Sequence, residues 1–230
     1  AQPVAEHAVA LVLAAAKRLV PKHTKMARGE FDQNSSNRLL AGGICGVLGY
    51  GGIGRATAQI MRAMGMTIHA ISRSGRPDGE AEFVGSLRDI DRVLSMSDVL
   101  VIALPLSDAT RGLIGERELA LMKRDAILIN VSRAHIVRED DLYWHLKANP
   151  EFWAGLDPWW IEPMTHGLFR LDYPFFDLPN VVGSPHNSGN VPGIFSILAR
   201  SAAENIRRFL AGEPGVRLVH PADRLSKAAS

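Results

Sequence analysis

The sequence predicts an α/β domain with a doubly wound parallel sheet. Short apolar segments alternate with helix-like segments from Leu39 to Leu210. The short segments are apolar at successive positions, not at alternate ones, which is typical of strands buried on both faces. A glycine-rich run at Gly49–Gly54 also follows the first of these strands. Together these observations favour parallel strands covered by helices on both sides.

The N-terminal segment predicts a helix over residues 3–20. Pro3 lies near its first turn, where proline is tolerated, and Ala, Leu and Val fill most of the following positions. Because such a helix is apolar on most sides, we expect it to be buried in an interface. Residues 21–37 are polar and predict a surface connection.

The remaining elements follow from the alternation of apolar and amphipathic segments. We expect strands at residues 44–48, 66–71, 98–104, 126–131, 153–156 and 181–183. We expect helices at residues 55–64, 87–96, 116–122, 140–147 and 194–210. The stretch 159–179 is rich in proline and aromatic residues and is the longest irregular connection, so it is a candidate functional loop.

The composition argues against several classes of protein. The 230 residues are 47% apolar and carry a net charge of +2, which gives no reason to expect binding to nucleic acid or to an anionic membrane. The single cysteine, Cys45, excludes an intramolecular disulfide framework and favours a cytoplasmic location. No apolar run approaches the roughly 18 residues of a membrane span, and no metal-ligand spacing is present.

The run Gly49–Gly54 has the spacing G-x-G-x-x-G between a strand and a helix. In that setting Gly49 permits a tight turn, Gly51 lets the backbone approach a pyrophosphate, and Gly54 lets the helix pack close to the strand. The helix N-terminus then presents N–H groups and a partial positive charge to the phosphates. The alternative is a purely structural turn; the strand–loop–helix context favours the dinucleotide site.

The end of the second expected strand bears on which dinucleotide binds. A NAD site of this type has Asp or Glu about 20 residues past the glycine loop, where it binds ribose hydroxyls. This chain instead has Ser72, Arg73 and Ser74, followed by Arg76. Guanidinium groups and hydroxyls suit the 2′-phosphate of NADP. We therefore predict a preference for NADP(H), with NAD(H) as the other candidate; a solvated turn is the alternative to both.

Three later segments carry candidate chemistry at the ends of expected strands. Arg133 follows one strand, and Asp157 and Glu162 follow the next. His186 lies in a loop after the last strand. Open α/β sheets bind ligands beyond the carboxyl ends of their strands, where these residues are expected. Each residue alone is more often a solvated or structural side chain, so it is their joint occurrence that favours a reaction site.

With these segments in view, the chain resembles the D-isomer-specific 2-hydroxyacid dehydrogenases, which include glyoxylate/hydroxypyruvate reductases and NAD-dependent formate dehydrogenase. The resemblance implies a Rossmann fold and an NAD(P)-dependent oxidoreductase that transfers a hydride between NAD(P)H and a small 2-keto acid or D-2-hydroxy acid. The segments that carry it are the first helix at 4–11, the glycine loop, the loop at 104–115, Asn130–Arg133, Asp157–Pro163 and Pro185–His186.

The resemblance also implies roles for single residues. Arg133 matches the arginine that binds the substrate carboxylate and polarises the carbonyl group. His186 matches the general acid, and Glu162 matches its partner carboxylate, which favours the protonated imidazole. Asp157 matches the residue that holds the nicotinamide carboxamide. The expected cofactor-binding set is Gly49, Tyr50, Gly51, Gly52, Ile53, Gly54, Ser72, Arg73, Ser74, Arg76, Leu104, Pro105, Val131, Ser132, Asp157 and Ser188.

In the family, the cofactor domain is inserted in a smaller substrate domain, and this chain begins at the first helix without a methionine. We therefore divide it into an interdomain or dimer helix (1–20), a cofactor domain (21–193), and a return helix with a tail (194–230). We expect a fragment or a truncated relative that turns over poorly alone. Exposed apolar surface on residues 4–20, where the family's cofactor domains meet, predicts a homodimer.

Departures from the family pattern concern the substrate. Ala134 replaces the usual glycine after the arginine, and Trp159 and Trp160 begin an aromatic-rich segment. A nucleotide-sensing binding protein resembling the C-terminal-binding corepressors remains an alternative, as does a formate dehydrogenase-like enzyme. An unrelated Rossmann enzyme is disfavoured, because the Arg, Glu and His series would then be a coincidence.

Overall fold

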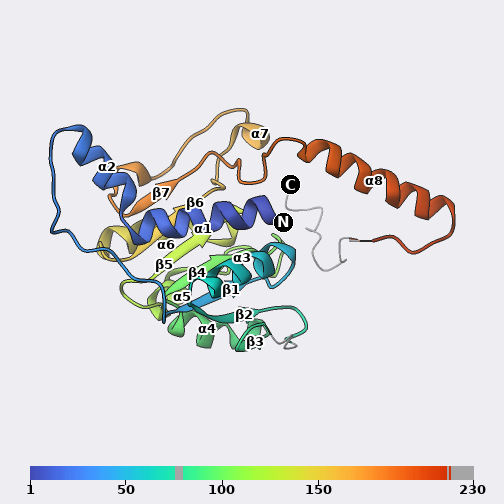
Figure 1. Ribbon diagram of the computed structural model, residues 1–230, viewed down its shortest axis with the longest axis horizontal. Helices are drawn as coiled ribbons and strands as arrows, with labels where there is room; N and C mark the ends of the chain where they lie inside the picture. The colour runs from blue at the N-terminus through green and yellow to red at the C-terminus, as the bar shows by residue number, and fades with distance from the viewer. Residues whose placement is uncertain (76–79, 217, 219–230) are drawn as a thin grey trace.

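The computed structural model describes residues 1–75, 80–216 and 218, and its centre is a parallel sheet. Seven strands lie in the order β3-β2-β1-β4-β5-β6-β7, so that β1 and β4 are neighbours where the winding of the chain reverses (Figure 1). This is the doubly wound arrangement that the sequence predicts, a Rossmann fold. The strands are β1 (Ile44–Leu48), β2 (Thr67–Ile71), β3 (Phe83–Gly85), β4 (Val99–Ile102), β5 (Ile127–Asn130), β6 (Trp153–Leu156) and β7 (Val181–Gly183).

The register of the sheet aligns all the strand ends. The last residue of each strand pairs with the last residue of its neighbour, so the seven form one row across the sheet. Every loop that follows a strand therefore starts at the same edge, which we call the carboxyl edge. The row is Gly85, Ile71, Leu48, Ile102, Asn130, Leu156 and Gly183.

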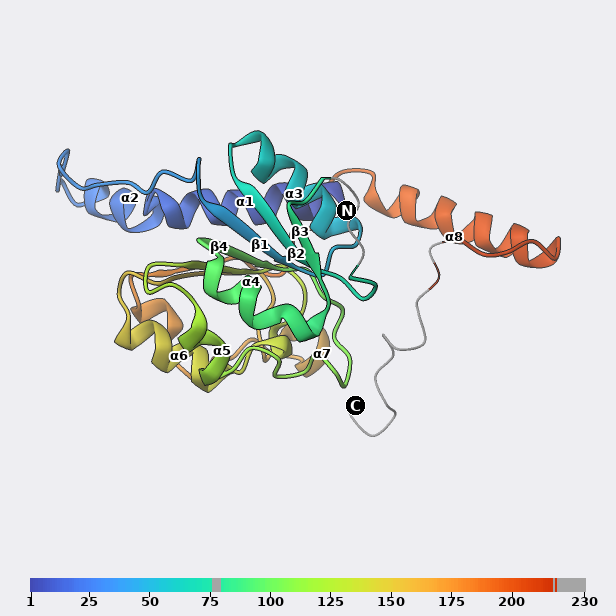
Figure 2. The same ribbon diagram turned by 90° about the horizontal axis from the view of Figure 1, so that it is seen from below.

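Two layers of helices cover the sheet, one on each face (Figure 2). On one face α1 and α3 pack over side chains such as Val47, Val101 and Ile129. On the other face α4, α5 and α6 pack over Leu100 and Leu128. The helices are α1 (Gln2–Ala16), α2 (Leu19–Ala27), α3 (Gly52–Ala63), α4 (Ile90–Met96), α5 (Glu116–Leu121), α6 (Glu139–Ala148), α7 (Pro163–His166) and α8 (Ile194–Leu210).

Two expectations for the N-terminal part are wrong. The helix predicted over 3–20 ends at Ala16, because Arg18 adopts a left-handed conformation with φ 51°. The connection predicted over 21–37 contains most of α2, in which Pro21 occupies the first turn and so does not interrupt the helix. No side chain of α2 is buried, so the sequence offers no apolar stripe by which to recognise it.

The helix α1 packs against its own sheet. It contacts α3, β5, β6 and β7, and Ala8 and Val12 are fully buried there. The expectation that residues 4–20 expose apolar surface to a partner is therefore wrong for α1. The apolar side chains that do remain exposed near this end lie on α2 and the loop after it: Leu19, Val20, Met26 and Phe31.

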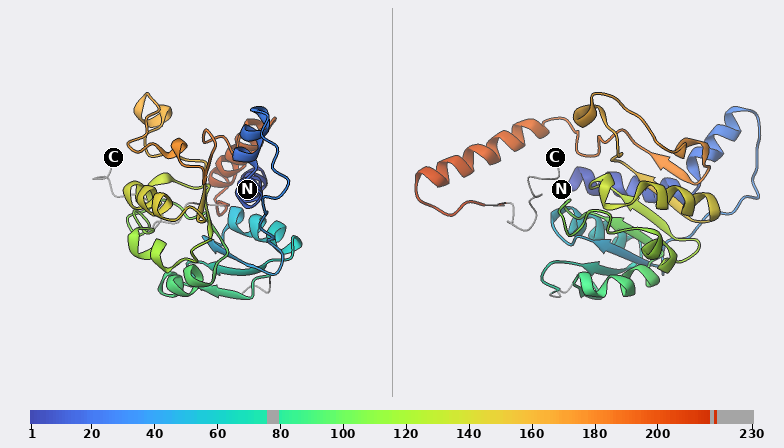
Figure 3. Two further views of the ribbon diagram at one scale, coloured as in Figure 1. Left: turned by 90° about the vertical axis from the view of Figure 1, so that its left-hand side faces the viewer. Right: turned by 180° about the vertical axis from the view of Figure 1, so that it is seen from behind.

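The helix α8 has the bounds that the sequence predicts, and it projects away from the body of the domain (Figures 1 and 3). None of its side chains is buried, and Phe195 and Phe209 are among its exposed apolar residues. Across the described part of the chain, no helix combines the length and the apolar character needed to span a membrane.

The thiol of Cys45 lies in the middle of this structure. Cys45 belongs to β1, which pairs with β2 on one side and β4 on the other, and the residue has no exposed surface. Burial raises the pKa of this thiol to about 12. Cys45 is therefore a structural residue of the core, as its place in an apolar strand indicates.

The carboxylate of Asp98 ties the amino ends of the central strands together. It accepts hydrogen bonds from the backbone N–H of Ile44 (2.7 Å), from Lys123 Nζ (2.8 Å) and from Arg38 (3.0 Å). Partial burial alone would raise the pKa of Asp98, but the hydrogen bonds and the two cations outweigh burial and hold the pKa below its ordinary value.

We predict that Asp98→Asn lowers the free energy of unfolding by about 1–3 kcal/mol at neutral pH. Because the pKa of Asp98 is lower in the folded state, its contribution is present above about pH 4 and is lost as the pH falls further. Urea unfolding at several pH values measures both effects. The control Asp125→Asn removes an exposed partner of Arg38 and should cost less than about 0.5 kcal/mol; equal losses in the two variants would contradict the prediction.

Candidate active site

The glycine loop lies at the centre of the carboxyl edge, between β1 and α3. Gly49 has φ 98°, and a Cβ on it would lie 2.6 Å from the backbone of Ala103, so only glycine fits. A Cβ on Gly51 would meet nothing within 4 Å, so this residue borders open space. No side chain caps α3, whose first N–H groups point to the same region. The loop thus combines a close turn, an open face and a helix N-terminus.

A cleft of about 890 Å³ runs along this edge from β3 to β4. It brings together three segments that the sequence assigned to the cofactor: the glycine loop, the end of β2 and the loop after β4. The predicted residues that line it are Gly49, Tyr50, Gly51, Ser72, Arg73, Ser74, Leu104 and Pro105. Arg76 lies outside the described residues.

The cleft also contains residues that the sequence analysis missed. Arg55 lies over the ring of Tyr50, with its guanidinium carbon 4.6 Å from the ring centre. Arg88 reaches the cleft from the turn after β3, a strand of three residues that the pattern did not reveal. Thr110 accepts a hydrogen bond from the N–H of Ser107 (2.8 Å) and donates one to the carbonyl of Pro105 (2.7 Å), which fixes the loop after β4.

The rest of the predicted cofactor set does not line the cleft. Gly52, Ile53 and Gly54 form the first turn of α3. Val131 and Ser132 are buried directly after β5, and Ser188 is buried in the loop that follows β7.

The loop after β5 carries Arg133 at the carboxyl edge. The side-chain oxygen of Asn130, the last residue of β5, accepts hydrogen bonds from the backbone N–H (3.1 Å) and the hydroxyl (2.9 Å) of Ser132. Its amide nitrogen donates to the carbonyl of Arg133 (3.0 Å). Arg133 is exposed, and one end of its guanidinium donates to the carbonyl of Ser132 (2.7 Å). Asn130 thus fixes the backbone that presents this cation.

His186 and Glu162 form the predicted pair. The Nδ1 atom of His186 lies 2.8 Å from a carboxylate oxygen of Glu162, whose side chain is 16% exposed. The other oxygen of Glu162 accepts a hydrogen bond from the backbone N–H of Trp159 (2.7 Å). Nδ1 is therefore engaged, and Nε2 is the nitrogen of His186 that remains to face a ligand. The pairing of a loop histidine with a held carboxylate is typical of acid–base chemistry.

Asp157 lies directly after β6 and is fully buried. Its carboxylate has no exposed surface, so a ligand cannot touch it unless neighbouring groups move. It accepts hydrogen bonds from the hydroxyl of Ser184 (2.6 Å) and from the backbone N–H groups of Asn187 (3.2 Å) and Ser188 (3.3 Å). In this structure Asp157 therefore fastens residues 184–188, which we call the His186 loop.

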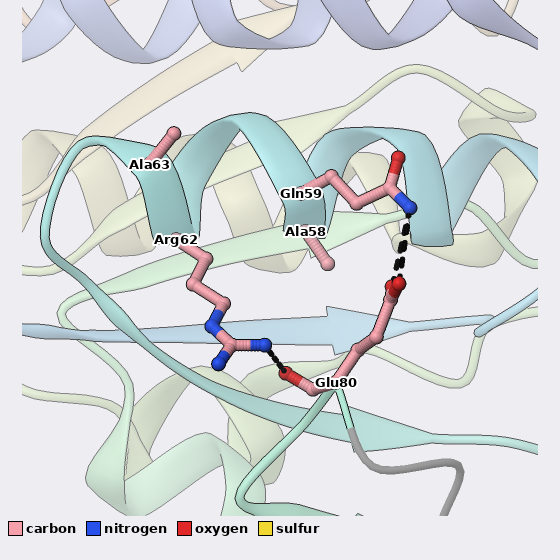
Figure 4. Close-up of a pocket in the computed structure, with 5 residues that line it drawn as sticks. All are labelled: Ala58, Gln59, Arg62, Ala63 and Glu80. Carbon is pink, nitrogen blue, oxygen red and sulfur yellow. Dashed lines mark hydrogen bonds between the residues drawn. The ribbon is translucent and has the colours of Figure 1, made fainter.

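Two other hollows lie outside the cleft. One, of about 530 Å³, lies against the His186–Glu162 pair and has apolar walls that include Trp159, Phe169 and Phe176. The other lies on the outer side of α3, where Gln59 and Arg62 both donate hydrogen bonds to Glu80 (Figure 4). The hollow at α3 shares no residue with the predicted site.

Two further features concern residues that metal sites or another class of Rossmann enzyme would use. Among the described residues, no group of three or more His, Cys, Asp and Glu is placed to hold a metal ion. Tyr143 and Lys147 on α6 have the Tyr-x-x-x-Lys spacing of another Rossmann enzyme class. Tyr143, however, is buried against Tyr173 and Phe175, and neither residue lines the cleft.

Comparison with known proteins identifies the family. The family model described as D-isomer specific 2-hydroxyacid dehydrogenase, NAD binding domain, matches residues 9–188. A glyoxylate reductase from Aeropyrum pernix is 36% identical over 95% of this chain and 66% of its own length. A glycerate dehydrogenase from Methylorubrum extorquens is 34% identical over 92% of this chain and 66% of its own. The chain thus spans about two thirds of the length of these curated relatives.

A solved structure of an enzyme from this family is also similar to this chain. The D-isomer specific 2-hydroxyacid dehydrogenase from Xanthobacter autotrophicus Py2, in complex with NADPH and MES, superposes with a TM-score of 0.81 at 30% identity. The match covers 96% of this chain and 88% of that one. The family model, the curated relatives and this structure lead to one conclusion: the chain belongs to the D-isomer specific 2-hydroxyacid dehydrogenase family, and residues 9–188 match its NAD binding domain.

Proposed function

We propose that this chain is the cofactor-binding part of an oxidoreductase that transfers a hydride between NADPH and a small 2-oxo acid or D-2-hydroxy acid. The observation that carries the proposal is the 2.8 Å contact between His186 and Glu162 at the edge that also holds the cleft. The names of the two relatives, glyoxylate reductase and glycerate dehydrogenase, support a substrate of this class.

The residues present fit a dinucleotide. The open face at Gly51 leaves room for a pyrophosphate, and the N-terminus of α3 offers N–H groups and a partial positive charge to it. Gly49, Ser72 and Leu104 would contact successive parts of the molecule along the cleft. When bound, the reduced nicotinamide would supply the hydride.

The protein's own groups supply the rest of the chemistry. Arg133 binds the substrate carboxylate with its guanidinium and polarises the adjacent carbonyl group. His186 donates a proton from Nε2 to the oxygen that becomes the hydroxyl, and takes it back in the oxidation. Glu162 orients the imidazole through Nδ1 and stabilises its protonated form. Trp159 holds Glu162 in place through its backbone N–H.

NADPH is the proposed cofactor, because the end of β2 places Ser72, Arg73 and Ser74 in the cleft where a NAD site has a carboxylate. Arg88 adds a further cation to the same cleft. The NADPH bound to the Xanthobacter relative supports this choice.

We further propose a homodimer formed through α2 and the loop after it. Val20 and Phe31 are exposed there, beside a hollow of about 430 Å³ that Phe31 and Trp153 line. Such an apolar surface favours association with a second copy. We also propose a cytoplasmic location, because the chain has a single cysteine and so no intramolecular disulfide, which is typical of proteins in a reducing compartment.

We predict that His186→Gln lowers the turnover of glyoxylate and hydroxypyruvate at least about 100-fold, since the proton donor is lost. The dissociation constant for NADPH should change less than about twofold, because His186 does not line the cleft. NADPH consumption and fluorescence titration measure the two quantities. His23→Gln, on exposed α2, is the control; turnover by His186→Gln close to that of the wild type would refute the assignment.

We predict that Arg73→Ala weakens NADPH binding about tenfold or more and changes NADH binding less than about threefold, since one charge-assisted hydrogen bond is lost. Calorimetric titration with each cofactor measures the ratio. Arg62→Ala, outside the cleft, should leave both affinities unchanged. The cofactor assignment fails if the wild type binds NADH more tightly than NADPH.

We predict that the wild-type chain sediments as a dimer at micromolar concentration and that the double variant Val20→Asp/Phe31→Asp sediments as a monomer, because each charge is costly to bury in an apolar interface. Phe209→Asp, on the projecting α8, is the control and should remain dimeric. A monomeric wild type, or dissociation of both variants alike, would argue against this interface.

A further inference from the structure

A chain of hydrogen bonds joins α1 to the His186 loop. The Nε2 atom of His7 lies 2.8 Å from the hydroxyl oxygen of Ser184, and that hydroxyl donates to Asp157 (2.6 Å). His7 Nε2 also lies 3.5 Å from the same carboxylate oxygen. Since the single hydroxyl proton of Ser184 goes to the carboxylate, Ser184 accepts from His7. His7 therefore carries its proton on Nε2 and donates it towards Asp157.

Asp157 holds the loop on which His186 lies. Its carboxylate is fully buried and accepts two backbone N–H groups of the loop, and its own carbonyl accepts the N–H of His186 (3.0 Å). His186 adopts φ 51°, a left-handed conformation that is unfavourable for a residue with a Cβ. Such a conformation persists only where neighbouring contacts enforce it, and here the contacts converge on Asp157.

Among the donor groups that the structure describes around Asp157, His7 is the one that does not belong to the His186 loop. The backbone donors and Ser184 all belong to the His186 loop and move with it. His7 belongs to α1, which is packed against the sheet and whose N-terminal end lies near the loop that leads to α8 (Figures 1 and 2). A buried carboxylate needs donors, and the donor His7 links this carboxylate and its loop to a helix that packs against the sheet.

We propose that His7 is a positioning residue, which holds the His186 loop in its active conformation through Ser184 and Asp157. The contacts that hold the His186 loop do not depend on which reaction the protein catalyses, but the expected effect of His7 on turnover rests on the proposed function. His7 does not line the cleft or the hollow beside the acid–base pair. Its effect is therefore expected on turnover and loop order, and not on cofactor affinity.

The test compares His7→Leu, which removes the donor, with His7→Gln, whose amide N–H can replace Nε2–H. Hydrogen exchange followed by NMR reads the loop directly. In His7→Leu we expect the amides of Asn187 and Ser188 to exchange at least about tenfold faster, with recovery in His7→Gln. The amide of Val131, which bonds to Ile102, should not change. Glu6→Ala, an exposed change on α1, is the matched control.

Turnover gives the second readout. In His7→Leu we expect kcat to fall about tenfold, with the NADPH dissociation constant within about twofold of the wild type and kcat restored in His7→Gln. Unchanged amide exchange in His7→Leu would overturn the proposal, as would an equal effect of Leu and Gln. Faster exchange of these amides, in a protein whose turnover is unchanged by His186→Gln, would refute the proposed function alone. Should His7→Leu not fold, Ser184→Ala interrupts the same chain of hydrogen bonds and must give the same acceleration.

Discussion

The parallel alignment of the seven strands, with their last residues in one row, is the constraint on which the rest of this structure depends. Because the strands end in register, each loop leaves the sheet at the same edge. The residues immediately after the row include Gly49, Ser72, Val131, Asp157 and Ser184, all of them in or beside the candidate site. Loop segments that are far apart in sequence thus lie close together, because the strands that precede them are neighbours in the sheet.

Much of the fold can be predicted from the sequence, because strands that are buried on both faces appear as short runs of apolar residues. β1 and β4 are apolar throughout, and β5 is apolar up to its last residue, Asn130. In α8 the apolar residues recur at the spacing of an amphipathic helix. The sequence does not reveal β3, because a strand of three residues is too short to show a hydrophobic pattern. Without β3, nothing in the sequence indicates that Arg88 follows a strand and lies at the carboxyl edge. The all-round apolar character of α1 indicates burial, but not whether its own sheet or a partner provides the cover.

Some parts of the candidate site could be predicted from the sequence and other parts could not. The positions of Arg133, Glu162 and His186 at the carboxyl edge could be predicted, because each residue follows a recognisable strand. The contact of His7 with Ser184 joins residues 177 positions apart and depends on how α1 crosses the sheet, which no local pattern encodes. The burial of Asp157 likewise results from the folding of the loop around it. Sequence therefore identifies the candidate reactive residues better than it identifies the residues that hold them in place.

The buried thiol of Cys45 provides a natural probe of how often the centre of the sheet opens. The thiolate is the form of cysteine that attacks thiol reagents, and a fully buried cysteine with a pKa of about 12 has almost no thiolate at neutral pH. Labelling of this single cysteine must therefore wait until β1 separates from its neighbours, and its rate reports the free energy of that opening. Since β1 leads directly into the glycine loop, a bound dinucleotide would slow the labelling in proportion to its occupancy. Binding of a dinucleotide at the glycine loop would thus protect the thiol of Cys45 from chemical labelling.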